Sequence, residues 1–453
     1  MAARCLVCLM AAALSLSGTA TVCRAQSAER WAAQQQAAAS KTDKIMADVN
    51  AHKGLLDQYL AMRNAYASDN SQAFRLLFGQ YISWYQSFLG AYPEAMDSFS
   101  IAQHAQPDDS PSPLAEDGYA AHPAIDTLPD LAKNYRVVLF NEAHNIALTR
   151  SLTVRLLSRL HDEGFNYFAA ETLVQTDTTL TSRGYPTDNS GFYTEEPIYA
   201  EMVRTALKLG YKVIAYEATT DTDNSDTRES EQAENLYKQV FARDPHARLV
   251  INAGYEHITK SGSYLGGASM AQHLHKLIAL PMLSIDQTTM YPHPSSSDDH
   301  PYYTAVMQKL QPQDAIVFVN ATGKPWSLRS TYDVNVFFPP SSLIRGRPAW
   351  LTLGDLRRPY AMSAEDCHAH YPCLIEARYG SEGDDAIPAD RLLLDLQPLG
   401  MDESHMALYS STQDVPSGNL YLRPGTYRLK FITKGDKVVH QEDIVVPDTQ
   451  THH

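Results

Sequence analysis

A glutamate and a histidine that could carry out acid–base chemistry directly follow an apolar run of the chain. Residues 136–140 are mostly β-favouring and apolar, and Glu142 and His144 come immediately after them. Open α/β sheets bind ligands beyond the carboxyl ends of their strands. An imidazole that titrates near neutral pH, placed beside a carboxylate at such an end, is suited to general-base catalysis. We therefore take Glu142 and His144 as the centre of a candidate site.

The segments that must position this pair have an alternating pattern. Short apolar runs alternate with stretches of helical spacing from residue 135 onward, which predicts an α/β fold with a mainly parallel sheet flanked by helices. Polar residues again stand at or just after the ends of the later runs: Glu171, Glu217, His257 and Asp286. Any one of them alone is more often a helix cap or a solvated charge. Because parallel strands place their carboxyl ends on one edge, the whole set favours a shared site.

A long polar loop is expected on the same edge. Residues 176–196 separate the second and third predicted strands and contain Arg183 and Tyr185. Long loops beside a ligand site often act as lids or contact the substrate. We therefore expect Arg183 and Tyr185, together with Glu217, to contact the substrate.

The remaining regions differ in pattern from this α/β segment. The organisation we expect is a signal peptide at 1–25, a helical region at 26–106, a linker at 107–134, the α/β domain at 135–340, an irregular segment at 341–388 and a small antiparallel β module at 389–453. The β module carries no cluster of catalytic residue types, so an accessory role is expected for it.

The composition restricts the compartment and the partners. A formal net charge of −15 argues against nucleic acid as a partner, because phosphate backbones are bound by basic patches. Arg4 and the apolar stretch 6–16 indicate a cleaved secretory signal, which is too short to span a bilayer. No later segment is apolar enough to form a transmembrane helix. A periplasmic or secreted protein is expected, with lipid attachment at Cys23 as the less favoured alternative.

Two of the five cysteines, Cys367 and Cys373, lie outside the first 25 residues. In an oxidising compartment they are expected to form a disulfide that closes a short loop. His368 and His370 stand between them, so a zinc site is the alternative, although a second cysteine pair is missing.

Several common catalytic motifs are missing from the sequence. There is no G-x-S-x-G elbow, no H-E-x-x-H helix, no P-loop and no G-x-G-x-x-G segment after a strand. A serine hydrolase of the α/β type is therefore not expected.

The order of the polar motifs resembles a known superfamily. Asn141-Glu142-Ala143-His144, then Ala170-Glu171, then Gly254-Tyr255-Glu256-His257 are similar to the motifs of the superfamily that joins erythromycin esterases, ChaN-type haem-binding proteins and the Tiki/TraB proteases. The resemblance covers about residues 135–286. It implies that Arg228, at the start of a charged helix, corresponds to the arginine of that superfamily. Asn141 stands where the superfamily usually has glycine, so it either restricts the approach of the substrate or offers its amide.

Hydrolysis of an ester or amide is the leading interpretation. His144 would act as the general base on a water molecule, and Glu142 or Glu171 would hold its other ring nitrogen. His257 and Arg228 would stabilise the developing oxyanion. The substrate would be a small molecule or a peptide.

Three alternatives remain open at this stage, and one of them is a catalytically inactive scaffold whose acidic strand ends are only solvated. A divalent metal (zinc, manganese or cobalt) could be bound by Glu142, His144, Glu171 and His257 and could generate the attacking hydroxide, as the Tiki-like members of the superfamily imply. The ChaN-like members instead imply a protein that binds haem or iron. The sequence says nothing of the oligomeric state.

Overall fold

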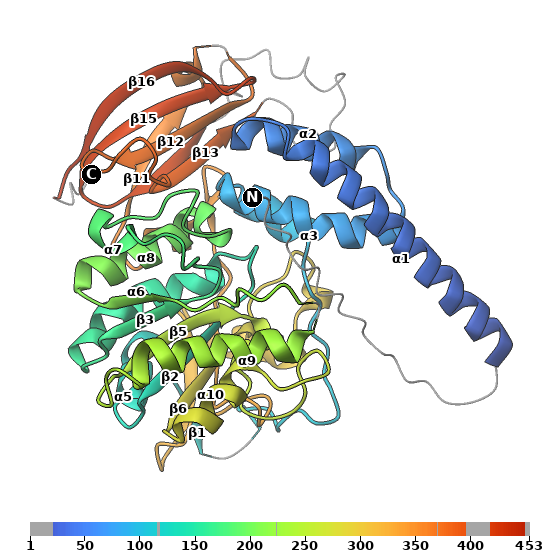
Figure 1. The fold of residues 1–453 in the computed structure, drawn as a ribbon, viewed down its shortest axis with the longest axis vertical. Helices are drawn as coiled ribbons and strands as arrows, with labels where there is room; N and C mark the ends of the chain where they lie inside the picture. The colour runs from blue at the N-terminus through green and yellow to red at the C-terminus, as the bar shows by residue number, and fades with distance from the viewer. Residues whose placement is uncertain (1–20, 116–117, 223, 369, 396–416, 449–453) are drawn as a thin grey trace.

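The computed structural model describes residues 21–115, 118–222, 224–368, 370–395 and 417–448. The apolar core of the expected signal peptide lies outside the described residues. In Figure 1, an α/β domain occupies the lower part of the molecule, with helices at one side of its upper edge and a β module above it.

The α/β domain is built on an eight-stranded sheet with the order β1-β7-β8-β6-β2-β5-β3-β4. Its parallel strands are β2 (Val137–Glu142), β3 (Tyr167–Ala170), β4 (Lys212–Ala215), β5 (Leu249–Gly254), β6 (Met282–Met290) and β8 (Val334–Phe337). At one edge of the sheet, β7 (Ile316–Asn320) pairs antiparallel with β8, and β1 (Tyr119–Pro123) pairs antiparallel with β7. The expected α/β fold with a mainly parallel sheet is confirmed.

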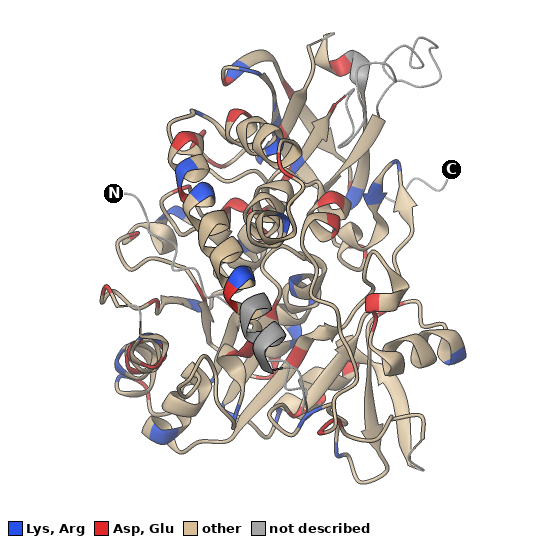
Figure 2. Ribbon diagram, turned by 90° about the vertical axis from the view of Figure 1, so that its right-hand side faces the viewer, with Lys and Arg blue, Asp and Glu red and all other residues tan. Residues whose placement is uncertain are grey.

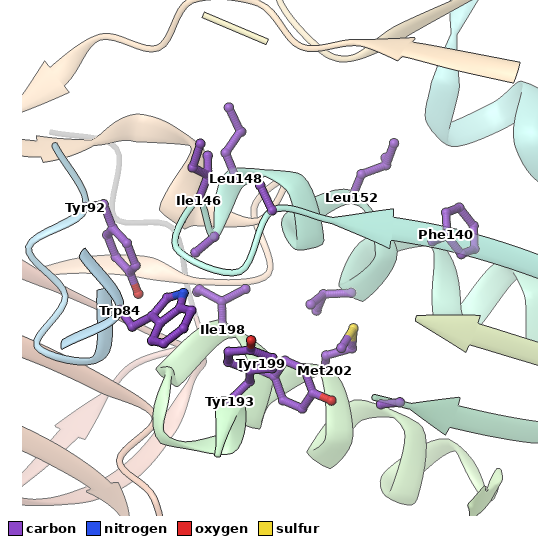
Figure 3. Close-up of a cluster of buried hydrophobic side chains, with 14 of the residues drawn as sticks. Trp84, Tyr92, Phe140, Ile146, Leu148, Leu152, Tyr193, Ile198, Tyr199 and Met202 are labelled. Atoms are coloured by element: carbon purple, nitrogen blue, oxygen red, sulfur yellow. The ribbon is translucent and has the colours of Figure 1, made fainter. Parts of the chain in front are cut away.

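Helices cover both faces of this sheet. The side chains of the central strand β2 are apolar on both faces and must be buried on both. Val138 and Phe140 pack into the core formed with α5 (Ala124–Ala132), α6 (Leu148–Asp162) and α8 (Pro197–Leu209), part of which is shown in Figure 3. Val137 and Leu139 face the other core, formed with α9 (Ser225–Leu236) and α10 (Met270–Ile278). The alternation of side chains along a strand thus divides one apolar run between two cores.

The expected helical region consists of α1 (Thr21–Val49), α2 (Leu55–Ala67), α3 (Gln72–Phe88) and α4 (Tyr92–Ser98). Helix α3 packs on the α/β domain through Trp84, whose ring lies edge-on to Phe192 and Tyr193 at 5.5 and 6.1 Å between centroids. These ring contacts hold the loop before α8 between the helical region and the sheet. The far end of α1 extends away from the rest of the molecule (Figure 1).

The stretch expected as a linker, 107–134, contains regular structure instead. It includes strand β1, which pairs with β7, and helix α5, which packs on the sheet. The sequence did not reveal β1 because four of its five residues are exposed, so it lacks an apolar run.

An antiparallel β module follows the α/β domain, as expected. A four-stranded sheet has the order β13-β12-β15-β16, and β11 pairs with β14 beside it. The bounds of these strands are β11 (Arg358–Ser363), β12 (Cys373–Tyr379), β13 (Asp390–Leu394), β14 (Ser417–Leu422), β15 (Gly425–Thr433) and β16 (Lys437–Val446). Strands β11 and β12 lie within 341–388, so that segment is less irregular than expected. The expected disulfide between Cys367 and Cys373 is present.

The remaining elements are short, apart from α11. They are α7 (Leu180–Arg183), α11 (Pro301–Leu310), β9 (Leu343–Ile344), β10 (Arg347–Pro348), a π-helical turn η2 (Tyr237–Phe241), and the 3₁₀ turns η1 (Tyr193–Glu195), η3 (Tyr255–Ile258), η4 (Ser296–Asp298), η5 (Ala349–Thr352) and η6 (Ala364–Cys367). Within the described residues, none of the helices has both the length and the apolar character needed to cross a bilayer.

Buried ion pairs attach the β module to helix α8. Arg204 of α8 donates two hydrogen bonds to the Glu382 carboxylate, at 2.8 and 2.7 Å. Glu201, one turn earlier, pairs with Arg357 at 3.1 Å and also with Arg423. These ion pairs fix the module to the helix that follows the candidate site. On the side of the molecule seen in Figure 2, acidic and basic residues are intermixed.

Candidate active site

Four of the predicted site residues lie together at the carboxyl edge of the sheet. Glu142 and His144 follow β2, Glu171 follows β3, and His257 lies in η3 after β5. Nδ1 of His144 lies 3.3 Å from Oε1 of Glu142, and Nε2 of His257 lies 3.3 Å from Oε1 of Glu171. All four side chains are buried. Strands β2, β5 and β3 are neighbours in the sheet, and this order brings the groups together.

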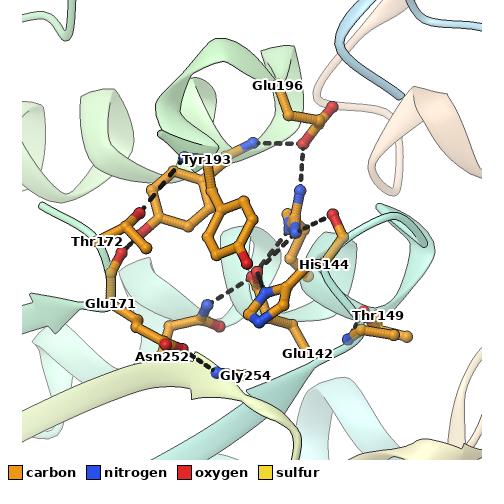
Figure 4. A network of polar contacts seen from close by, with 12 residues as sticks. Glu142, His144, Thr149, Glu171, Thr172, Tyr193, Glu196, Asn252 and Gly254 are labelled. Carbon is orange, nitrogen blue, oxygen red and sulfur yellow. Dashed lines mark hydrogen bonds and ion pairs between the residues drawn. The ribbon is translucent and has the colours of Figure 1, made fainter. Parts of the chain in front are cut away.

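Gly254, the last residue of β5, joins the two halves of this cluster (Figure 4). Its backbone N–H donates to Oε2 of Glu171 at 2.5 Å. A Cβ atom on Gly254 would lie 2.2 Å from Cε1 of His144 and 3.1 Å from Oε2 of Glu171. Since its φ of −73° is ordinary for any residue, glycine is required here for space and not for conformation.

Arg150 of α6 holds Glu142 in place. Its Nε and Nη2 donate to the two carboxylate oxygens of Glu142 at 2.8 and 2.6 Å, and Asn252 donates to Oε2 at 2.7 Å. Burial raises the pKa of Glu142, but the charge of Arg150 and the contact with His144 more than offset this and leave the pKa below its ordinary value. Glu142 is therefore an ionised group whose position is fixed.

Glu196 links this arginine to the start of α8. One oxygen of Glu196 accepts from Nη1 of Arg150 at 2.8 Å, and the carboxylate also caps α8 by accepting from the N–H groups of Ile198 and Tyr199. Tyr92 of the helical region donates its hydroxyl to Glu196 at 2.8 Å. The site is consequently connected to both the α8 helix and the N-terminal helices.

Two tyrosines enclose the His144 ring. Tyr193 stacks on it, with centroids 4.0 Å apart and an interplanar angle of 18°, and Tyr255 lies edge-on at 5.1 Å. The His144 side chain is 10% exposed. Among the described residues no hydrogen bond is made to its Nε2, the ring nitrogen opposite the contact to Glu142.

His257 is a charged bridge between carboxylates. Its Nδ1 lies 2.7 Å from Oε1 of Glu229, opposite the contact to Glu171. Burial lowers the pKa of His257, but the charges of Glu171 and Glu229 outweigh burial and raise it to about 10. In turn, the pKa of Glu171 lies well below its ordinary value, since His257, His144 and Arg228 together outweigh its burial. Both N–H groups of the imidazolium thus face carboxylates.

Arg228 and Glu217 complete the cluster on its more exposed side. Arg228 donates to the two oxygens of Glu217 at 3.0 and 2.9 Å and to Oε1 of Glu171 at 3.1 Å. The side chains of Arg228 and Glu217 are 24% and 20% exposed, against 6% for Glu171. The structure therefore places the predicted Glu217 at the cluster, as a partner of Arg228.

The other predicted substrate contacts are engaged elsewhere. Asn141 is buried, donating to Oδ1 of Asp286 at 2.8 Å and accepting from the N–H of Gln287 at 2.6 Å, so its amide ties β2 to β6. Arg183 pairs with Asp177 at 2.6 Å within its own loop. The hydroxyl of Tyr185 lies 3.3 Å from Oδ1 of Asp385, near the β module. Each of these three side chains thus has a polar partner within the protein.

Reasoning from the sequence missed four residues of the site: Arg150, Tyr193, Glu196 and Glu229. Arg150 is one of three arginines in α6 and nothing in the spacing distinguishes it from the others. Glu229 follows Arg228 directly, which is the one signal that could have found it. Tyr193 and Glu196 lie in the loop that was expected to act as a lid.

The predicted metal ligands do not fit a metal ion as they are arranged. Glu142 is occupied by Arg150 and Asn252, and both nitrogens of His257 face carboxylates. Within the described part of the chain, no group of three or more His, Cys, Asp or Glu side chains has the arrangement of a metal site.

Comparison with known proteins finds weak similarity to solved structures. No family model matches the chain, and no curated protein matches its sequence. Among solved structures, the type III effector HopBA1 is similar at 10% identity and a TM-score of 0.31 over 52% of this chain and 99% of that one. The RRSP effector domain of a MARTX toxin from Vibrio vulnificus is similar at 13% identity and a TM-score of 0.26 over 54% and 55% of the two chains.

Proposed function

We propose that the protein is a secreted or periplasmic hydrolase of ester or amide bonds with His144 as its general base. The observation that carries this proposal is the pairing of His144 with an ionised Glu142 that Arg150 holds from the other side. A carboxylate on Nδ1 fixes the tautomer in which Nε2 is the free base. The resemblance of the motifs to the erythromycin esterase, ChaN and Tiki superfamily adds support.

The proposed reaction begins with a water molecule at Nε2 of His144. The imidazole takes a proton from this water while the oxygen forms a bond to the carbonyl carbon, and the carbonyl electron pair moves onto its oxygen. The tetrahedral intermediate then collapses, breaks the bond to the leaving alcohol or amine, and the imidazolium returns its proton to that group. General-base assistance of this kind contributes about 10²–10⁴-fold to the rate.

Arg228 is the better candidate for stabilising the developing negative charge. It is more exposed than the other charged groups of the cluster, and its Nη1 has only a distant contact of 3.8 Å to Glu229. His257 has no N–H left to donate to a substrate, since Glu171 and Glu229 take both. We therefore assign His257 a positioning role, in place of the oxyanion contact expected from the sequence.

A panel of esters and amides assayed with the His144→Ala variant tests the proposal. We expect kcat/KM to fall by about 10²–10⁴-fold because the base is lost. The exposed His246, replaced by alanine, is the matched control and should retain full turnover. Unchanged turnover in His144→Ala would refute the assignment.

The alternative drawn from the sequence, binding of haem or iron, has a direct test of its own. Titration of the protein with haem should leave free haem in solution if the chain is a hydrolase. A Soret band that appears on titration and disappears in a His144 or His257 variant would instead favour the haem alternative.

A further inference from the structure

A cavity of about 180 Å³ lies beside the catalytic pair, between the sheet edge and the segment that follows α4. Its wall includes Ala143 and Asn145, the neighbours of His144 in the chain. Three tyrosines also line it, Tyr255, Tyr291 and Tyr332, and we call it the tyrosine pocket.

The size of the tyrosine pocket limits what it can hold. An engineered protein cavity of about 150 Å³ accommodates one benzene molecule. At about 180 Å³, the tyrosine pocket has room for one ring or for a branched group of similar volume. A long chain or a multi-ring system would have to extend out of it.

The charges of its wall favour a cation. Glu256 lines the pocket and is partly buried, and among the described residues its carboxylate has no hydrogen bond or ion pair. Burial raises the pKa of Glu256, and the Arg329 guanidinium offsets part of this rise. Arg329 also lines the pocket, but its Nε donates to Oδ1 of Asp109 at 3.3 Å, which balances its charge. Glu256 is therefore a carboxylate at the pocket wall that no cation of the described residues contacts directly.

Tyrosine rings together with a carboxylate are a known solution for binding organic ammonium groups. Aromatic rings attract cations through their quadrupole, and cages of such rings recognise quaternary ammonium ligands. A carboxylate beside the rings adds a charge that a neutral ligand of equal shape cannot use. The wall of the tyrosine pocket combines both features.

Tyr255 connects the pocket to the catalytic histidine. Its ring is edge-on to His144 while its side chain lines the pocket. Its φ of 42° lies in the left-handed region, which a tyrosine rarely adopts, and such backbone strain concentrates at functional sites. Tyr255 is therefore the residue shared by the pocket wall and the surroundings of the His144 ring.

The outer wall of the pocket is held in place before any ligand binds. Asn145 donates to the carbonyl of Phe99 at 2.8 Å, Nε2 of His293 lies 3.0 Å from the carbonyl oxygen of Ile101, and the N–H of Gln103 donates to Asp298 at 2.7 Å. A preformed pocket loses less ordering entropy when a ligand binds.

We propose that the tyrosine pocket binds an organic ammonium group of about one-ring size. This assignment rests on the proposed function for its role, which is to hold the cationic part of a substrate whose ester or amide bond lies at His144. The substrates would then be esters or amides that carry an ammonium group close to the scissile bond.

Binding of a matched pair of probes tests the ligand class without any turnover. Choline and 3,3-dimethylbutan-1-ol have nearly the same shape and differ in charge, so calorimetric titration of both into the full chain isolates the effect of the cation. We expect choline to bind at least about tenfold more tightly, and Glu256→Gln to reduce this preference while 3,3-dimethylbutan-1-ol is unaffected. Equal binding of the two probes, or a preference that Glu256→Gln leaves unchanged, would overturn the proposal.

A second variant keeps the proposal testable if Glu256→Gln does not fold. Tyr332→Leu removes a ring and leaves Glu256 in place, and we expect it to weaken binding of choline by a larger factor than binding of the neutral probe. Equal weakening of both probes would contradict a cation-binding role for the ring. Circular dichroism shows whether each variant is folded.

Turnover of paired esters then separates the pocket from the hydrolase proposal. Choline and 3,3-dimethylbutyl esters of the same acid should both lose hydrolysis in His144→Ala, whereas Glu256→Gln should lower only the ratio of kcat/KM between them. If choline binds with the expected dependence on Glu256 but neither ester is hydrolysed, the ligand class stands and the hydrolase proposal fails. If both esters are hydrolysed at equal rates, the pocket assignment fails and the hydrolase proposal stands.

Discussion

The backbone of Gly254 lies directly against the imidazole of His144, with no space for a side chain between them. A Cβ atom there would come within 2.2 Å of Cε1 and 2.4 Å of Nε2. The end of strand β5 thus forms the surface on which the ring of His144, two residues after β2, rests.

Replacing Gly254 by alanine should displace His144 and lower turnover. We expect a loss of about 100-fold in kcat/KM, because small misplacements of catalytic groups have effects of this size, and a stability loss of about 1–3 kcal/mol from overpacking. Gly210→Ala is the control, since its φ of 87° costs about 1–2 kcal/mol but no atom lies within 4 Å of the added methyl. Similar activity in the two variants would contradict the steric role of Gly254.

Arg150 should be far more important for stability than another arginine of the same helix. Arg150→Met leaves the buried carboxylates of Glu142 and Glu196 without their cation, so we expect the free energy of unfolding to fall by about 3–5 kcal/mol. Arg155→Met removes a pair with the half-exposed Asp314 and should cost less than about 1 kcal/mol. Urea denaturation of both variants measures the difference, and equal losses would show that the buried network contributes little.

The charge of His257 should make the protein less stable at alkaline pH. Its pKa is raised to about 10 in the folded chain, above the unfolded value near 6.5, so its contribution is complete below pH 6.5 and is lost as pH rises toward 10. The free energy of unfolding should fall there by at most about 1.4 kcal/mol per pH unit, and the slope should be smaller in His257→Asn. His246→Asn is the surface control. An NMR titration in which the His257 ring deprotonates near pH 6.5 would rule out the bridge.

The stack of Tyr193 on His144 should affect turnover through the orientation of the ring. Tyr193→Leu removes the stack, and we expect kcat to fall by about tenfold with little change in KM. Phe192→Leu is the neighbouring control, because Phe192 packs edge-on to Trp84, Phe88 and Tyr193 and makes no ring contact with His144. If both variants lose kcat equally, packing of the loop is responsible and the stack is not.

Removal of divalent metals should leave the activity unchanged. Each carboxylate of the site is in contact with Arg150, Arg228 or His257, so a metal would have to displace these cations first. We expect dialysis against a chelator to change neither turnover nor the melting temperature. A loss of turnover that zinc, manganese or cobalt restores would show that the cluster rearranges around a metal.

The sequence alone predicts that Glu142, His144, Glu171 and His257 lie close together. Each follows an apolar run, and the carboxyl ends of neighbouring parallel strands necessarily share an edge. This prediction needs only one local pattern, an apolar run followed by a polar residue, which is repeated along the chain. The common location of these four side chains is therefore predictable from the order of the residues.

Only the tertiary structure decided what these groups are bonded to and how they are charged. Arg150 donates a hydrogen bond to Glu196, which lies 46 residues further along the chain, and Tyr92 donates to the same carboxylate from 104 residues away. No local sequence pattern predicts these contacts. The same kind of distant contact converts His257 from an expected oxyanion donor into a buried cation between two carboxylates. The identity of a residue sets which charges it can carry, but the neighbours brought by packing determine its protonation state, since the field of close charges outweighs burial.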